Sequence, residues 1–503
     1  NMIIGNTISN TYILIYQCMG AGIGGFYSYD IDETKVLRID HNNIKNNEII
    51  TDQYHAMGAG IGIISLTLKD STNAVHLRSN NIVENIVETK DINAHGGGLY
   101  IQNMQALLIQ NRIANNQANA YVRIFGGGIA FVDDKTFHTY LLSLENNTIS
   151  ENYSSGNSES YGGGLFIRGG VLEMKKNMLN SNSLGLAGIK KQGGGISLQL
   201  LEKPAMIVHN EFQNNSAISG EGGAICAISE EIQYLTVEGN LFAYDSAGNG
   251  GAMRAERCDI DFYNNVFNHN HAQQGGALSL CGYGNNTTTN SYRLINNTFA
   301  HNRASYNGGA LFSSYNDPVI INNIFYGDEA LRGKEIFSPP GGLIEIAYTN
   351  IDVGKIDGKY YDGFGLFEQN PAFCDSLGYD CMIGCTSPCI NSGVEEYISY
   401  ITGTHFHCPE YDILMNPRPL GGAIDIGAFE LFPFDIEEEV NGNLPVNMVA
   451  YPNPVRDLIK LQYKTSYQTH VNIEFYNLAG MKVFALHHNA LNPGIQSEEI
   501  NLD

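Results

Sequence analysis

The sequence predicts an all-β chain: a long solenoid of stacked strands followed by a small antiparallel β-sandwich. Two repeated motifs and a closing segment of alternating strands support this prediction. The 503 residues include 56 glycines and no tryptophan, and only 16% of them are charged. This composition suits short strands joined by tight turns, and it disfavours helical bundles.

The first motif places a large apolar residue two positions after an asparagine, and it recurs eleven times. The apolar residue is isoleucine from Ile8 to Ile149, then Leu179, and phenylalanine from Phe212 to Phe325. A second asparagine or an aspartate usually follows three residues later, with Thr11 in its place in the first repeat. The first asparagines are Asn6, Asn42, Asn80, Asn111, Asn147, Asn177, Asn210, Asn240, Asn265, Asn297 and Asn323.

The interval between these asparagines varies from 25 to 38 residues. Helical repeats keep a nearly constant length, whereas loops between the strands of a β-solenoid absorb insertions. Stacked coils would bring equivalent amides to about 4.8 Å from each other, where they can hydrogen-bond. We therefore expect the asparagines to form a structural ladder, with the apolar residues stacked inside.

The second motif is a glycine-rich turn that opens a strand, as in Gly96-Gly97-Gly98 and Gly162-Gly163-Gly164. Side chains alternate along a strand, so the first residue after each turn should face the core and the next should face outward. The expected inward residues are Leu99, Ile129, Leu165, Ile196, Ile225, Met253, Leu278 and Leu311. Tyr100, Phe166 and Phe312 are the large aromatic residues among those expected to face outward.

The two alternating motifs over residues 1–330 resemble the repeats of right-handed parallel β-helix surface proteins of bacteria, which share their fold with pectate lyases. The resemblance implies a right-handed parallel β-helix. It does not imply one function, because one fold carries many activities.

Residues 331–434 lose the repeat, and we interpret them as the last coils and a cysteine-rich C-terminal cap over the open sheet edge. Asp425 lies in this segment, and a turn or capping role is favoured over a catalytic one. The five cysteines from Cys374 to Cys408 favour an oxidising compartment with one or two disulfides. Free thiols and a metal site are the alternatives.

Residues 435–447 are predicted to be an acidic linker, and residues 448–503 a separate, truncated β-sandwich. The motifs Tyr451-Pro452-Asn453-Pro454 and Asn477-Leu478-Ala479-Gly480 resemble the type A sorting domain of the type IX secretion system of Bacteroidota. The resemblance implies export across the outer membrane, release or cell-surface attachment, and the type IX machinery as a partner. A generic binding module is the alternative.

The chain starts within a repeat at Asn1 and stops before the Gly-x-Tyr hairpin and basic terminus usual in this family, so we expect it to be a fragment at both ends.

The formal net charge of -24 disfavours nucleic acid as a partner, and no stretch of about 20 apolar residues predicts a membrane-spanning helix. The expected ligand is an extracellular polysaccharide or a cell-surface glycan. Tyr100, Phe166 and Phe312 are weak candidates for stacking on sugar rings, although packing beneath long loops would explain them equally well.

Weak catalytic candidates follow Gly250-Gly251, and they are Arg254, Glu256, Arg257, Asp259 and Asp261. Solvated charges on a strand are the competing interpretation. His269 and His301 hold equivalent positions, where a turn substitution is favoured over a ligand site. We expect no cofactor and no metal centre, with calcium as the one ion that a lyase of this fold would use.

Two functions remain open at this point. The favoured one is a non-catalytic, adhesin-like protein that binds glycans or cell surfaces. The alternative is a polysaccharide lyase or glycoside hydrolase that acts on an extracellular polysaccharide.

Overall fold

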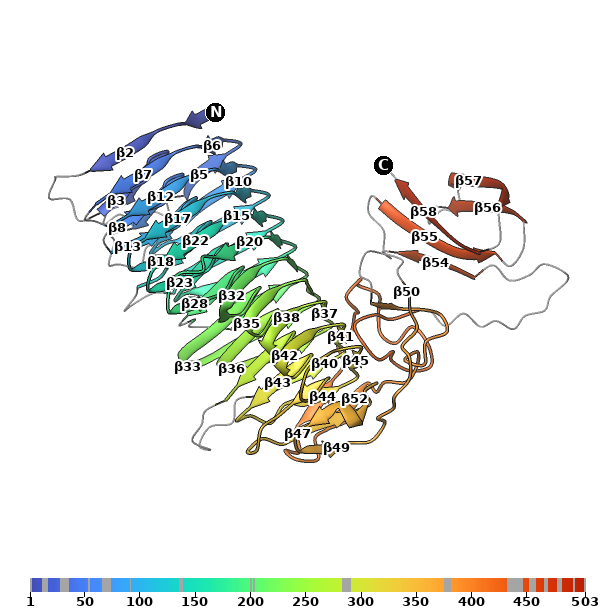
Figure 1. Cartoon of the computed structure of the whole chain (residues 1–503). Helices are drawn as coiled ribbons and strands as arrows, with labels where there is room; N and C mark the ends of the chain where they lie inside the picture. The colour runs from blue at the N-terminus through green and yellow to red at the C-terminus, as the bar shows by residue number, and fades with distance from the viewer. Residues whose placement is uncertain are drawn as a thin grey trace.

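The computed structural model describes residues 2–10, 17–27, 36–52, 55–65, 74–90, 92–134, 139–199, 201, 204–282, 291–374, 381–431, 447–451, 458–465, 469–476, 482–491 and 494–501. Within these residues the chain is built from β-strands, with one short 3-10 helix, η1 (Val353–Lys355). None of its helical segments is long and apolar enough to cross a membrane. The chain winds as a right-handed parallel β-helix, whose coils stack from the blue N-terminal end to the yellow region of Figure 1.

Three parallel sheets run along the described part of the solenoid. Sheet A contains β1 (Met2–Ile4), β6 (Asn43–Lys45), β11 (Asn81–Val83), β16 (Arg112–Ala114), β21 (Thr148–Ser150), β26 (Met178–Asn180), β31 (Glu211–Gln213), β34 (Leu241–Ala243), β37 (Val266–Asn268), β41 (Thr298–Ala300) and β45 (Ile324–Tyr326).

Sheet B contains β2 (Thr7–Asn10), β3 (Gln17–Met19), β7 (Glu48–Thr51), β8 (His55–Met57), β12 (Ile86–Thr89), β13 (Asn93–His95), β17 (Gln117–Ala120), β18 (Arg123–Phe125), β22 (Tyr153–Gly156), β23 (Glu159–Tyr161), β27 (Ser183–Leu184), β28 (Lys190–Gln192), β32 (Ser216–Glu221), β35 (Ser246–Asn249), β38 (His271–Gln274) and β42 (Arg303–Asn307).

Sheet C contains β4 (Ile23–Tyr27), β5 (Val36–Asp40), β9 (Ile61–Ser65), β10 (Ala74–Arg78), β14 (Leu99–Gln102), β15 (Gln105–Ile109), β19 (Ile129–Val132), β20 (Leu141–Glu145), β24 (Leu165–Arg168), β25 (Val171–Lys175), β29 (Ile196–Gln199), β30 (Ala205–Val208), β33 (Ile225–Glu238), β36 (Met253–Tyr263), β39 (Leu278–Cys281), β40 (Tyr292–Ile295), β43 (Leu311–Ser314), β44 (Val319–Ile321), β46 (Ile336–Phe337), β47 (Ile344–Ala347), β48 (Ile356–Asp357) and β49 (Tyr360–Asp362).

Each coil turns where a residue adopts the left-handed backbone region. In the coil that starts with β11, the residues at the three main corners are Glu84 (φ 56°), Gly96 (φ 54°) and Gln110 (φ 55°). Glycine is required at the second corner, because a Cβ on Gly96 would lie 2.0 Å from the Leu99 carbonyl oxygen. The same crowding holds at Gly98, where a Cβ would lie 2.9 Å from the Asn116 side chain.

Ten asparagines form one ladder beside sheet A. Asn111 Nδ2 donates to Asn147 Oδ1 at 3.0 Å, and Asn147 Nδ2 donates to Asn177 Oδ1 at 3.0 Å. The same side-chain bond joins successive members from Asn42 to Asn323, at 3.0 to 3.1 Å. The coils are therefore stacked in the register that the repeat predicts.

A second ladder follows the turn after sheet A, and it corrects one assignment. Asn6 Nδ2 donates to Asn47 Oδ1 at 2.9 Å, so Asn6 belongs to this second ladder and not to the first. The physical reason is the register of the first coil. Ile3 pairs with Ile44, so Asn6 lies level with Asn47, three residues after each isoleucine. The second ladder continues through Asn85, Asn116, Asn152, Asn182, Asn215, Asp245, Asn270, Asn302 and Asp328.

The apolar members of the repeat fill the interior. Ile44, Ile82, Ile113, Ile149 and Leu179 are fully buried, and a stack of phenylalanines continues this column. The rings from Phe212 through Phe242, Phe267 and Phe299 to Phe325 lie 4.6 to 4.9 Å apart and are nearly parallel. All eight residues predicted to face inward from the glycine turns, from Leu99 to Leu311, are fully buried as well.

The segment after the last coil, which the sequence predicts to close the end of the solenoid, returns along the outer face of sheet A. Leu241, Val266 and Ile324 face outward there and pack with Ile426 and Phe429 of the returning segment. The segment also contains two short hairpins, β50 (Phe373–Cys374) with β51 (Met382–Ile383), and β52 (Glu396–Ile398) with β53 (His405–His407). The apolar outer face of the last coils needs this cover.

Asp425 has a structural position within the cap. It is 1% exposed, and its carboxylate accepts hydrogen bonds from the backbone N–H groups of Asn391 and Leu431, each at 2.7 Å. The predicted disulfides are not present in the structure. Cys389 instead accepts a hydrogen bond from Asn350, and Cys408 donates one to Asn296.

The C-terminal region forms two antiparallel sheets that share a small core. One contains β54 (Asn447–Tyr451), β55 (Leu458–Thr465) and β58 (Gly494–Asn501), and the other contains β56 (Thr469–Tyr476) and β57 (Lys482–Leu491). Leu461 and Ile473 come from different sheets and are buried in one cluster, as expected for a β-sandwich. The predicted linker before Asn447 and most of both sorting motifs lie outside the described residues.

Candidate functional site

A column of aromatic rings lies on the outer face of sheet B, formed by the residues just before three successive glycine turns. The ring centroids of His95 and Phe125 lie 4.7 Å apart, and those of Phe125 and Tyr161 lie 5.3 Å apart. His55 lies beside the column, two positions before Met57, which pairs with His95, and its ring is 6.3 Å from that of His95. The column exists because β8, β13, β18 and β23 pair in parallel and in register.

Tyr100 and Phe166 lie beside this column and come from sheet C. The Tyr100 ring meets the His95 ring edge-on at 5.5 Å, and the Phe166 ring lies 4.9 Å from that of Phe125. Both side chains point away from the main core, as predicted, but only 3% of Tyr100 and 1% of Phe166 is exposed. Neither ring therefore offers an open face to a sugar, and the two form the floor of a site instead.

A cavity of about 280 Å³, which we call the aromatic cavity, is lined by the rings of His55, His95, Tyr100, Phe125 and Phe166. Its polar residues are Asn93, Gln102, Arg123, Asp134 and Arg168. Gln102 accepts a hydrogen bond from the Tyr100 hydroxyl at 2.8 Å and donates one to Asp134 at 2.6 Å. An apolar floor with a few placed polar groups is the usual composition of a ligand site.

In the aromatic cavity, the buried atoms Oδ1 of Asn93 and Nδ1 of His95 have no hydrogen-bond partner among the described residues. Burial, with smaller contributions from His55 and Arg168, lowers the pKa of His95 to about 3, so its imidazole is neutral at physiological pH. Buried polar atoms usually have partners, which makes these two available to the hydroxyl or N–H groups of a ligand.

The structure brings together two of the three predicted sugar-binding aromatics, Tyr100 and Phe166, and leaves Phe312 apart. Phe312 packs against Phe337 at 5.7 Å, many coils away. Sequence reasoning missed His95, Phe125 and Tyr161. The sequence did contain a pattern that could have found them, since each directly precedes the first glycine of a turn.

The predicted catalytic cluster is divided between two structural ion-pair groups. Arg254 Nη2 donates to Glu256 at 2.9 Å, and its Nε lies 2.9 Å from a carboxylate oxygen of Glu221. The remaining nitrogen of the guanidinium donates to the Ser279 hydroxyl at 3.1 Å. Its charge is thus satisfied by the sheet itself.

Arg257 interrupts β36 with a φ of 59° and turns the strand at this point. Asp259 and Asp261 lie beyond that turn, where Asp259 accepts a hydrogen bond from the Ser291 backbone at 2.8 Å and Asp261 pairs with Arg293. The two carboxylates therefore do not converge with Arg254 and Glu256 on one open site.

His269 and His301 adopt φ angles of 54° and 56°, as Asn46, Asn115 and Asn214 do in other coils. Their rings lie 5.2 Å apart. This matches the turn substitution favoured from the sequence. In the part of the chain that the structure describes, no group of three or more His, Cys, Asp or Glu side chains is arranged to hold a metal ion.

Comparison with known proteins adds one finding to this geometry. Residues 449–503 match the family described as "Secretion system C-terminal sorting domain". No curated protein and no solved structure matches the chain. The fold and this match define the class: a secreted or cell-surface parallel β-helix protein with a C-terminal sorting domain. The sorting domain marks it for export by the type IX system to the cell surface or the extracellular space.

Proposed function

We propose that this protein binds an extracellular polysaccharide or cell-surface glycan through the aromatic cavity, without catalysis. The observation that carries the proposal is the pairing of an aromatic floor with the unsatisfied atoms Asn93 Oδ1 and His95 Nδ1. A sugar presents apolar C–H faces and hydroxyl groups together, which complement this combination.

The charges around the aromatic cavity also suit a polyhydroxylated ligand. Arg123 and Glu159 pair at 2.8 Å, and the Tyr161 hydroxyl donates to Glu159 at 3.1 Å. These paired groups keep the local charge balanced while leaving lone pairs and N–H groups for hydrogen bonds. A neutral or weakly charged glycan avoids the repulsion that a highly anionic polymer would meet from a chain of net charge -24.

A panel of extracellular polysaccharides, titrated against the purified chain, tests this proposal. Phe125 is half-buried and lies in the aromatic cavity, so Phe125→Ala should weaken binding about tenfold, the effect of losing roughly 1.4 kcal/mol of contact. Phe312→Ala is the matched control, because Phe312 is also half-buried on an outward position but lies outside this cavity.

Equal losses of affinity in the two variants, at unchanged thermal stability, would show that the aromatic cavity is not the binding site. The same panel addresses the catalytic alternative, since a lyase releases unsaturated products that absorb in the ultraviolet. Release of such a product would reverse the assignment in favour of an enzyme. The paired state of Arg254 favours the binding function.

A further inference from the structure

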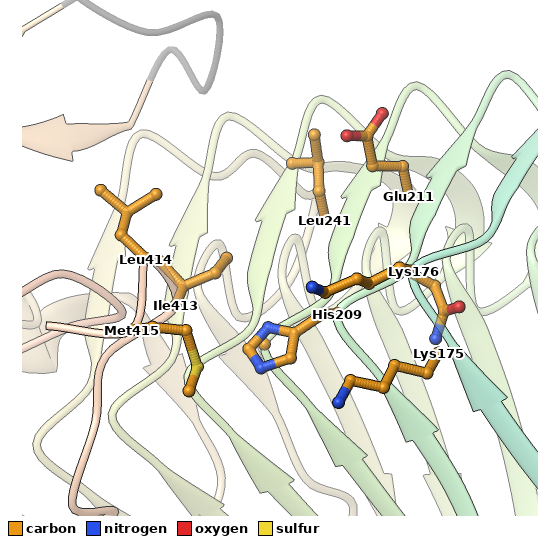
Figure 2. Close-up of a pocket in the computed structure, with 10 residues that line it drawn as sticks. Lys175, Lys176, His209, Glu211, Leu241, Ile413, Leu414 and Met415 are labelled. Carbon is orange, nitrogen blue, oxygen red and sulfur yellow. The ribbon is translucent and has the colours of Figure 1, made fainter. Parts of the chain in front are cut away.

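A second cavity, of about 270 Å³, lies between the solenoid and the cap. Figure 2 shows it bounded by Lys175, Lys176 and His209 from the solenoid and by the cap segment Ile413, Leu414 and Met415. We call it the basic cavity. It does not share a residue with the aromatic cavity.

The basic cavity concentrates positive charge in a chain that carries 52 acidic and only 28 basic residues. Lys175 and Lys176 are both exposed, and neither forms an ion pair with a residue that the structure describes. Glu211 also lines the cavity, but Figure 2 shows its carboxylate directed away from the two ammonium groups. Two adjacent ammonium groups repel each other and attract an anion.

The imidazole ring of His209 forms one wall of the basic cavity. In its neutral form the ring can donate an N–H hydrogen bond without adding positive charge. Burial, followed by the nearby charges of Lys175 and Lys176, lowers the pKa of His209. The His209 ring packs directly against Gly239. A side chain there would collide with it, since a Cβ on Gly239 would lie 2.5 Å from His209 Nδ1. This packing holds the imidazole at the base of the cavity.

The cap side of the basic cavity is apolar. Ile413 and Leu241 are buried beneath it, and Met415 is 47% exposed at its rim. An inorganic anion would use the lysines alone, whereas a ligand with an apolar part would also contact Leu414 and Met415. The arrangement therefore distinguishes a basic end from an apolar end.

We propose that the basic cavity binds a small amphiphilic oxyanion, with its sulfate, phosphate or carboxylate group between Lys175 and Lys176. Its apolar body lies against Leu414 and Met415 of the cap. Such a ligand bridges the solenoid and the cap, so it also stabilises the docked position of the cap.

Calorimetric titration of the full chain with sodium sulfate and with sodium hexyl sulfate, at constant ionic strength, tests the proposal. Both probes should bind saturably, and hexyl sulfate should bind about fivefold more tightly because it buries apolar surface. The double variant Lys175→Gln/Lys176→Gln should lose at least about tenfold in affinity for both probes. Met415→Ser should weaken hexyl sulfate alone.

Lys334→Gln is the matched control, since Lys334 is exposed on a distant coil and carries the same charge. It should change neither affinity. Non-saturable binding of both probes, or equal affinities for the double variant and the control, would overturn the proposal. Sulfate binding without a preference for hexyl sulfate would retain the anion site and reject its apolar part.

Discussion

At the scale of single residues, the asparagine ladders explain how this chain buries so many polar side chains. Asn147 Nδ2 donates both to Asn177 Oδ1 at 3.0 Å and to the Leu108 carbonyl at 2.8 Å. Asn177 Oδ1 also accepts from the Asn147 backbone N–H at 2.9 Å. Each amide is thus satisfied on both sides, and the ladder aligns one coil with the next.

Asp245 breaks the pattern of the second ladder and leads to the first prediction. Its Oδ1 accepts from Asn215, but its Oδ2 takes the place of a donating NH2 group and is buried without a partner among the described residues. Burial raises the pKa of Asp245 well above its ordinary value. Ionising this carboxyl group in the folded protein therefore carries a free-energy cost that the unfolded chain does not have.

Asp245→Asn should therefore stabilise the protein by about 1 to 2 kcal/mol at neutral pH, because it restores the donor. Because the pKa of Asp245 is higher in the folded protein than in the unfolded chain, folding favours the protonated form. The contribution of this aspartate to the free energy of unfolding therefore falls as the pH rises above about 4, the pKa of an unfolded aspartate. The gain should shrink in acid, which thermal unfolding at pH 4 and pH 8 would measure. Asn182→Asp, in the same ladder, is the control and should destabilise. A gain that is identical at both pH values would contradict the raised pKa of Asp245.

At the scale of elements, the cap is held by a buried ion pair at its centre. Arg418 and Glu430 pair at 3.0 Å with both side chains fully buried. Arg418 also donates to the backbone carbonyls of Asp425 and Gly427, each at 2.9 Å. The cap further donates and accepts hydrogen bonds with Asn264 on the solenoid.

Arg418→Met should release the cap from the solenoid. Removing one partner of a buried ion pair leaves an uncompensated carboxyl group and costs about 3 to 5 kcal/mol. Limited proteolysis should then cleave within residues 381–431 at a protease concentration that leaves the parent protein intact. Arg303→Met is the control, since Arg303 and Glu329 form an exposed pair at 3.8 Å. Equal resistance of both variants would show that the cap does not depend on this pair.

The sequence was sufficient to predict the coils but not the cavities. Asparagine spacing and glycine turns repeat in every coil, so the columns from Asn42 to Asn323 could be derived from pattern alone. The position before the glycine turn changes from Met57 to His95, Phe125, Tyr161 and Gln192, and this irregular column gave no repeat to follow. Whether Tyr100 is exposed or covered depended on those neighbouring side chains.

The side on which the cap packs could have been read from the sequence in part. The outward residue that begins each sheet A strand is polar or charged in most early coils, as in Asn81 and Arg112, and apolar at Leu241 and Val266. This change marks where the cap covers the sheet. The contacts that hold it, such as the Asn296 amide on the Asp425 carbonyl at 3.0 Å, join residues 129 positions apart and have no local pattern.

At the scale of the whole molecule, the chain combines a parallel β-helix with a C-terminal export signal. The matched sorting domain at residues 449–503 marks the chain for export to the cell surface or the extracellular space. The formal net charge of -24 would repel the phosphate groups of nucleic acid.

Removal of residues 449–503 should abolish delivery without unfolding the solenoid, because the sorting domain has its own core around Leu461 and Ile473. The truncated protein, made in a host with the type IX system, should accumulate inside the outer membrane. Immunoblots of periplasmic, surface and culture fractions measure this. Surface delivery equal to that of the parent chain would show that export depends on another segment.

Hydrogen–deuterium exchange of the full chain, with and without a bound polysaccharide, tests the central claim most directly. A glycan in the aromatic cavity should slow exchange in peptides that cover 93–102, 123–132 and 159–168, while peptides of the later coils stay unchanged. Protection confined to the coils around Arg254 or to the cap would contradict the account and place the site elsewhere.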